Sequence, residues 1–246
     1  MNYAFINGKI ASMVEYGQFF EAISIINNKI AKIGTNEEIK EAIDSDTKII
    51  DLRNRLVLPG FNDSHLHLLN YGYTKNMVQL HKCKSIDELI DATNRYIDGG
   101  NIAKGKWILG RGWNQDYLLE GRFPTREDLD RISMDHPICF IRTCGHVAVG
   151  NTVAVEMASE KKINLKNVDL EKGCFFEDGC EYIYDIINSP SVEDIKQLIL
   201  SAGKDFAMGG ITSVQSDDLA TMPDGDYKKV IKAYQELNDE GLLPVR

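Results

Sequence analysis

The sequence predicts an α/β fold in which a small β-rich domain precedes the first strands of a parallel, TIM-like barrel. Three observations support this. Short β-prone runs separated by turn dipeptides fill residues 1–58, an apolar run leads into two histidines at 57–67, and helix and strand patterns alternate after residue 191. We therefore expect domains at 1–58 and 59–246, the second carrying an α+β insertion at about 68–190.

The first domain is predicted to hold two hairpins, a short helix and a returning strand. Asn7-Gly8 and Asn27-Asn28 are the turn signals of the hairpins. The capping-box pattern Thr35-Asn36-Glu37-Glu38 opens a helix that we expect to reach about Ile43. Lys48–Leu52 then returns as a strand.

The most informative motif is the pair His65 and His67, which follows the apolar run. In an extended strand, residues two apart point to the same side, so Asp63, His65 and His67 are predicted to share one face. Two imidazoles on one face are half of a site for zinc or a similar divalent ion. Asp63 is then expected to hydrogen-bond one of the ligand imidazoles and fix its orientation, without binding the metal itself.

Several segments resemble a known family. The run 59–67, Pro-Gly-Phe-Asn-Asp-Ser-His-Leu-His, is similar to the first-strand signature of the amidohydrolase superfamily. Residues 4–10 and 22–34 resemble the small β-domain that precedes the barrel in that superfamily, and 107–114 and 145–151 resemble its family-three branch. The resemblance spans essentially the whole chain.

The resemblance implies a metal-dependent hydrolase barrel, with residues 1–58 forming half of a composite β-sandwich. It also implies His65 and His67 as metal ligands, with zinc the expected metal. Relatives take further ligands from later strands, including histidines and often a carboxylated lysine, and an aspartate there handles the proton. The implied reaction is hydrolysis of an amide or other C–N bond in a small molecule, by water that the metal activates.

The insertion is predicted to contain a helix at about 86–97 opened by a capping box at Ser85, and a strand at 107–109. A helix after Pro124-Thr125 and a strand at 138–141 follow. Because excursions from the carboxyl end of a barrel strand cover the active-site face, we expect a lid or pocket wall, with a purely stabilising insertion as the alternative. From this segment Trp113 and His146 are predicted to contact substrate, with structural roles as the alternative.

The last part of the chain is predicted to alternate between helix and strand. A capping box at Ser191 opens a helix that Gly209-Gly210 ends. A buried strand at 211–215, a helix at about 226–240 and the start of a strand at 242–246 follow. Gln215, Ser216 and Asp217 end the second barrel strand, so Gln215 and Asp217 are predicted at the pocket rim, or else as solvated turn residues.

Only two to three of the eight strands of a barrel fit this length, so we expect an N-terminal part of a longer enzyme. The 246-residue chain alone is then expected to be inactive and to self-associate through exposed barrel edges. Two alternatives remain open: a catalytically silent fragment, and a metal-dependent phosphoesterase.

The composition limits the kinds of partner, location and metal site that we expect for this protein. The net charge of -9 and the lack of a basic block argue against nucleic acid or an anionic membrane. Without a signal segment or an apolar run long enough to span a bilayer, the expected location is the cytoplasm. Five cysteines without C-x-x-C spacing indicate reduced thiols. A metal cluster of Cys139, Cys144 and His146, or a ligand role for His81 or His136, is disfavoured.

Overall fold

The computed structural model describes residues 2–100, 102–161 and 166–246, which fall into two compact units. The first unit comprises the residues up to Asn62 together with Gly210–Ser213. The second comprises Asp63–Gly209 and Val214–Arg246. Each unit combines helices and strands, so the prediction of an α/β fold holds for the chain, with sheets of mixed direction.

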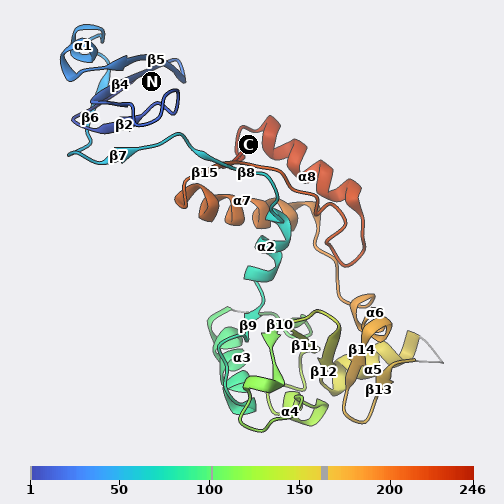
Figure 1. Cartoon of the computed structure of the whole chain (residues 1–246). Helices are drawn as coiled ribbons and strands as arrows, with labels where there is room; N and C mark the ends of the chain where they lie inside the picture. The colour runs from blue at the N-terminus through green and yellow to red at the C-terminus, as the bar shows by residue number, and fades with distance from the viewer. Residues whose placement is uncertain (1, 101, 162–165) are drawn as a thin grey trace. The chain divides into compact units, whose positions relative to one another are not determined.

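The described residues of the first unit up to β7 form two small sheets and one helix (Figure 1). The sheet orders are β5-β4-β1-β6 and β3-β2-β7. The elements are β1 (Tyr3–Ile6), β2 (Lys9–Ala11), β3 (Phe19–Phe20), β4 (Ala22–Ile26), β5 (Lys29–Gly34), α1 (Asn36–Glu41), β6 (Lys48–Asp51) and β7 (Leu56–Val57). Its core is formed by Ala4, Ile6, Ala22 and Ile39.

Local signals account for several of these elements. Asn27 and Asn28 both take positive φ values, 52° and 60°, and join β4 and β5 as an antiparallel hairpin. Thr35 and Glu38 form the predicted capping box, each side chain bonding the other's backbone N–H. These two predictions are confirmed.

The hairpin predicted at Asn7-Gly8 is wrong. Asn7 has a positive φ of 55°, yet β1 pairs with β4 and β6 whereas β2 pairs with β3 and β7. The chain turns a corner here from one sheet into the other, and the Gly8 N–H donates to the Glu21 carbonyl at 2.8 Å. A side chain at Gly8 would collide with Leu52, so the glycine serves close packing.

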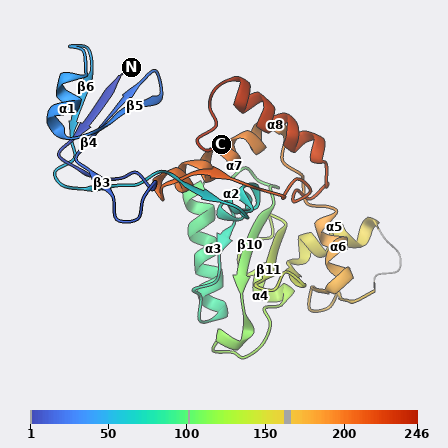
Figure 2. The same ribbon diagram turned by 45° about the horizontal axis from the view of Figure 1, so that its top comes forward.

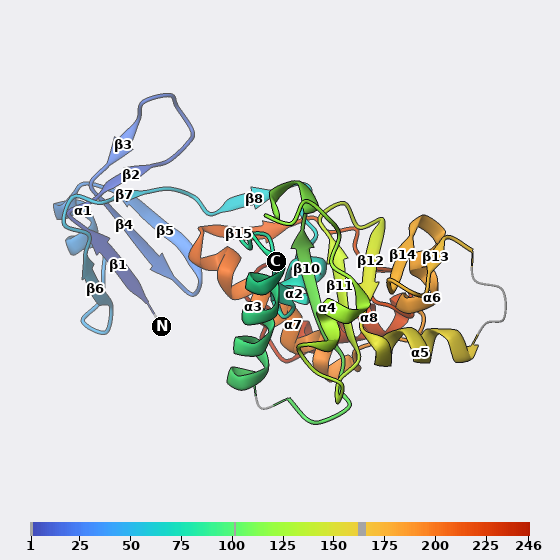
Figure 3. The same cartoon turned by 90° about the horizontal axis from the view of Figure 1, so that it is seen from below.

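The second unit contains a mixed sheet of order β13-β14-β12-β11-β10-β9. Figure 3 shows β10, β11 and β12 side by side within it. Its elements are α2 (Leu68–Lys75), β9 (Val78–Gln79), α3 (Ile86–Gly100), β10 (Ile108–Trp113), a 3-10 turn (Gln115–Tyr117), α4 (Arg126–Asp130), β11 (Ile138–Arg142), β12 (Val147–Gly150), α5 (Thr152–Lys161), β13 (Val168–Asp169), β14 (Cys174–Phe176), a 3-10 turn (Glu177–Gly179), α6 (Cys180–Tyr184), α7 (Val192–Met208) and α8 (Tyr227–Asp239).

Most predicted elements of this unit are present. The helices after Ser85, Thr125, Ser191 and Asp226 all form, as does the strand from Ile138. The strand predicted at 107–109 extends to Trp113, because Gly110 lets the Leu80 and Phe140 side chains close over it.

Helices α2, α7 and α8 pack together around one core (Figure 2). Leu68 and Leu69 of α2 are fully buried in it beside Ile195 and Ile199 of α7. α2 follows His67 directly, at the start of the interval predicted as the insertion. The Leu68-Leu69 pair starts α2 at once, because its burial against α7 stabilises that first turn.

Strands β8 (Phe61–Asp63) and β15 (Ile211–Val214) form a two-stranded sheet. Two predictions about this region are wrong. β15 is only partly buried because β8 is its sole strand partner among the described residues. Residues 242–246 form no strand in the structure as described; one hydrogen bond joins the Val214 N–H to the Arg246 carbonyl at 2.8 Å, which is too little for a ladder.

Among the described helices, none combines the length and the apolar character that crossing a bilayer requires.

Candidate metal centre

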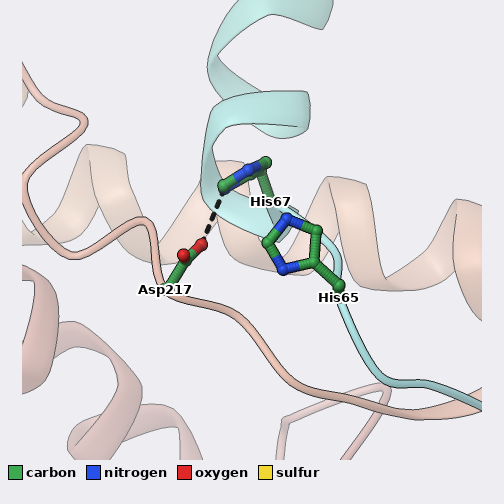
Figure 4. A group of neighbouring side chains, drawn as sticks. All are labelled: His65, His67 and Asp217. Atoms are coloured by element: carbon green, nitrogen blue, oxygen red, sulfur yellow. Dashed lines mark ion pairs between the residues drawn. The ribbon is translucent and has the colours of Figure 1, made fainter.

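Three side chains from distant parts of the sequence meet at one place. His65, His67 and Asp217 each offer a ligand atom, and these atoms all lie within 4.8 Å of one another. The two rings lie edge to face with centroids 5.1 Å apart, and Asp217 faces His67 (Figure 4). His67 Nδ1 and Asp217 Oδ1 are 3.0 Å apart. All three residues are exposed, so the group is open to an ion and to a substrate.

The backbone around the group is held by hydrogen bonds between two segments. The Gln215 N–H donates to the Asp63 carbonyl at 2.9 Å, and the Leu66 N–H donates to the Gln215 carbonyl at 3.0 Å. Gln215, predicted at a pocket rim, therefore ties the histidine segment to the segment that carries Asp217.

The two histidines do not lie on an extended strand, and that prediction is wrong. β8 ends at Asp63, His65 lies in a bend, and His67 is the N-cap residue of α2. The chain leaves the extended conformation early because the Asp63 carboxylate accepts the His65 backbone N–H at 3.1 Å, a short-range bond typical of turns. The rings converge through a bend followed by a helix start.

Asp63 and Asp217 thus hold different places from those predicted. Asp63 bonds backbone and contacts no imidazole nitrogen by hydrogen bond in the described structure. Asp217, expected at the rim, lies against His67 instead. The carboxylate beside His67 therefore comes from the loop that follows β15, and not from the histidine segment itself.

Asp218 is a structural residue that the sequence did not single out. It is 5% exposed, and its carboxylate accepts the Asn70 N–H at 2.8 Å and the Ser216 hydroxyl at 2.5 Å. The loop that carries Asp217 is thereby fixed to α2.

The chemistry of the group fits a divalent cation. Two neutral imidazole nitrogens and one carboxylate oxygen are donors that zinc accepts, and three protein ligands leave a further position open. His65, His67 and Asp217 are therefore the residues that could hold the ion.

Trp113 and His146 lie elsewhere. Trp113 is 1% exposed, and its indole N–H donates to the Phe140 carbonyl at 3.1 Å within the core. The ring packs edge to face against Phe123, with centroids 5.3 Å apart. His146 is exposed, with Nδ1 3.0 Å from Glu177 Oε2.

Neither the remaining histidines nor the cysteines form a metal-ligand group among the residues described. His136 is buried with Nδ1 2.9 Å from the Lys106 carbonyl oxygen. All five cysteines are free. Burial raises the pKa of the Cys139 and Cys174 thiols, to about 11 for Cys174, which disfavours the thiolate that metal binding needs.

Comparison with known proteins identifies the family. The model described as the amidohydrolase family matches residues 48–246. The chain belongs to the amidohydrolase family. The resemblance predicted from residues 59–67 is thus confirmed.

Relatives of this amidohydrolase-family chain include YtcJ of Bacillus subtilis, which bears the name amidohydrolase. The two are 28% identical over 249 residues, 97% of this chain and 46% of YtcJ. N-substituted formamide deformylase of Arthrobacter pascens is 26% identical over 154 residues, 62% of this chain and 28% of that enzyme.

A solved structure, a metal-dependent hydrolase from Pyrococcus horikoshii OT3, matches with a TM-score of 0.78 and 32% identity, covering 100% of this chain and 47% of that one. The chain therefore spans about half the length of YtcJ and of this hydrolase.

Proposed function

We propose that His65, His67 and Asp217 form part of the metal centre of a hydrolase that cleaves amide or related C–N bonds. The observation that carries this proposal is that their three ligand atoms lie within 4.8 Å of one another, although the histidines follow β8 and Asp217 follows β15. The relative named N-substituted formamide deformylase acts, by its name, on an amide, which supports the C–N class. Zinc is the metal that the donor set favours.

The chain's own residues have distinct parts in this chemistry. His65 and His67 would each give an imidazole nitrogen to the cation and Asp217 a carboxylate oxygen, and the 3.0 Å between Asp217 Oδ1 and His67 Nδ1 shows that this carboxylate already lies beside the ring. Asp63 and Gln215 keep the two segments in register through backbone hydrogen bonds. When bound, a divalent ion lowers the pKa of coordinated water toward neutrality and polarises the carbonyl of the substrate.

We further propose that β8 and β15 are neighbouring strands at the start of a TIM-like barrel within 59–246. The Phe61 N–H donates to the Gly210 carbonyl, and the Gln215 N–H donates to the Asp63 carbonyl. Residue numbers therefore increase in the same direction along both segments, as in a parallel pair of strands. The sheet β9 to β14 lies in the interval assigned to the insertion, and residues 1–58 correspond to half of a composite β-sandwich.

Metal binding by the full 246-residue chain tests the site directly. Titration calorimetry with Zn²⁺ or Mn²⁺ should give one site whose affinity falls at least about ten-fold in His65→Asn and in His67→Asn, and also in Asp217→Asn. His146→Asn is the matched control, because His146 is also exposed and paired with a carboxylate. Equal affinity in all four variants and the parent chain would contradict the proposal.

The reaction class needs a separate assay. The metal-loaded chain is offered N-acyl amino acids, N-substituted formamides and phosphate esters. Turnover of an amide that His67→Asn abolishes supports C–N hydrolysis, whereas turnover of a phosphate ester alone indicates a phosphoesterase. Metal binding without any turnover indicates a chain that is silent by itself.

A further inference from the structure

The second unit contains a cavity of about 310 Å³. Several residues on its wall follow closely in the sequence after His67 or after Asp217 of the candidate metal centre. Its wall includes Asn70 and Thr74 of α2, the helix that His67 caps. On another side it includes Thr221 and Met222, which follow Asp217 on the same loop. The Asn70 N–H bond to Asp218 fixes these two walls to each other. The cavity is thus built on the same two segments as the metal centre.

Among the described residues, Arg111 is the only one with a charged side chain on this wall. It comes from β10 and is partly buried. A Cβ built on Gly145 would lie 4.0 Å from Arg111 Nη2, so the guanidinium end lies beside the Gly145 turn. The Tyr184 hydroxyl donates to the Gly145 carbonyl at 3.4 Å and closes this end of the cavity.

The Arg111 guanidinium has no hydrogen-bond or ion-pair partner within the described part of the chain. Two other arginines of this unit, Arg122 and Arg131, have carboxylate partners. Arg122 lies 2.6 Å from Asp128, and Arg131 lies 2.7 Å from Asp87. A partly buried cation facing a cavity without a partner loses hydration, and an anionic ligand group restores that interaction by two parallel hydrogen bonds.

The rest of the wall is largely apolar. Met77, Leu109, Ile141, Ile187 and Met222 surround the space, and Asn70 and Thr74 add polar groups on the α2 side. The cavity volume falls in the range of small-molecule sites. One cation in an apolar cavity balances a single negative charge, which favours a carboxylate over a phosphate dianion.

We propose that this cavity binds the carboxylate of a small amide substrate through Arg111, with an apolar group of the substrate between β10, β11 and α2. The substrate class is then a carboxylate-bearing amide such as an N-acyl amino acid. This inference rests on the proposed hydrolase function for its meaning as a substrate site. Selective binding of a carboxylate at Arg111 can, however, be measured without any turnover of substrate.

The test is a binding measurement on the full chain without added metal. Titration calorimetry compares N-acetylleucine with N-acetylleucinamide, which differ in charge but little in size. We expect the parent chain to prefer the carboxylate at least about ten-fold, which is about 1.4 kcal/mol. Arg111→Gln should abolish this preference, and Arg111→Lys should keep part of it because the charge remains.

Arg55→Gln is the matched control, because Arg55 is exposed, belongs to the first unit and is not one of the cavity-lining residues. Thermal melting of each variant establishes that it is folded. Equal affinity for the two ligands, no binding of either, tighter binding of inorganic phosphate, or a preference that survives in Arg111→Gln would each overturn the proposal. Failure of the metal titration with intact carboxylate preference would instead count against the metal centre alone.

Discussion

Single residues decide what the candidate site can do, and Trp113 shows how burial separates chemistry from packing. Trp113 stands in a family-like segment, yet its ring is in the core and its N–H is used by the Phe140 carbonyl. His67 and Asp217, by contrast, are exposed and face each other. A tryptophan with its polar atom already bonded inside the core stabilises the fold and leaves recognition to other side chains.

Trp113→Phe should lower the free energy of unfolding by about 1–2 kcal/mol, because it removes the indole hydrogen bond and leaves the Phe140 carbonyl without that donor. Trp113→Ala should cost about 3–5 kcal/mol through the cavity it creates. Urea unfolding measures both. Tyr117→Phe, at an exposed aromatic residue, should change stability by less than about 0.5 kcal/mol. An unchanged stability in Trp113→Phe together with weaker binding of N-acetylleucine would argue for a binding role.

At the scale of secondary-structure elements, helix ends and contacts between helices are determined differently. Three capping boxes begin α1, α4 and α7, and each closes within four residues. Contacts between helices depend on the partner instead. Gly72 of α2 faces the Leu198 backbone carbonyl of α7, and a Cβ there would lie only 2.5 Å from that oxygen. Glycine is therefore required at the α2–α7 contact.

Gly72→Ala should destabilise the second unit by about 1–3 kcal/mol, because the added methyl group forces α2 away from α7. Gly99→Ala is the matched control within a helix. A Cβ at Gly99 meets nothing within 4 Å, so alanine should be neutral or should stabilise α3 by up to about 1 kcal/mol. Thermal unfolding of the two variants gives the comparison, and equal effects would refute the close α2–α7 contact.

The α4 capping box should make stability depend on pH. Burial acts to raise the pKa of Asp128, but hydrogen bonds from Arg122 and Thr125 outweigh it and hold that pKa below the ordinary value. A folded-state pKa below the unfolded one stabilises the protein above about pH 4, and this contribution is lost as pH falls through the folded pKa. Asp128→Asn should therefore lower the melting temperature at pH 7 and have less effect at pH 3. Glu127→Gln, exposed on the same turn, should change little at either pH.

At the scale of the whole molecule, exposed strand edges are the main liability. β5 is the outer strand of its sheet, and Ile30 on it is 68% exposed. An exposed edge strand with an apolar side chain favours pairing with a second copy. We predict concentration-dependent self-association of the chain in sizing chromatography, reduced in Ile30→Lys. Val14→Lys, at an 81% exposed loop residue, serves as the control. A single sharp monomer peak at all concentrations would contradict the prediction.

What the sequence alone determined was local. The Asn27-Asn28 turn, the capping boxes at Thr35 and Ser191, and the helix after Thr125 were identified correctly, because their hydrogen bonds and dihedral preferences act within about four residues. The family resemblance in the histidine segment was also a local signal.

Only the tertiary structure decided which distant segments meet. It separated β1 from β2, started α2 directly after His67, and placed Asp217 against a histidine 150 positions earlier in the chain. It also left Arg111 facing a cavity. Such contacts are selected by the burial of apolar faces and by strand pairing across long loops, whose closure cost grows only slowly with length, so spacing in the sequence does not specify them.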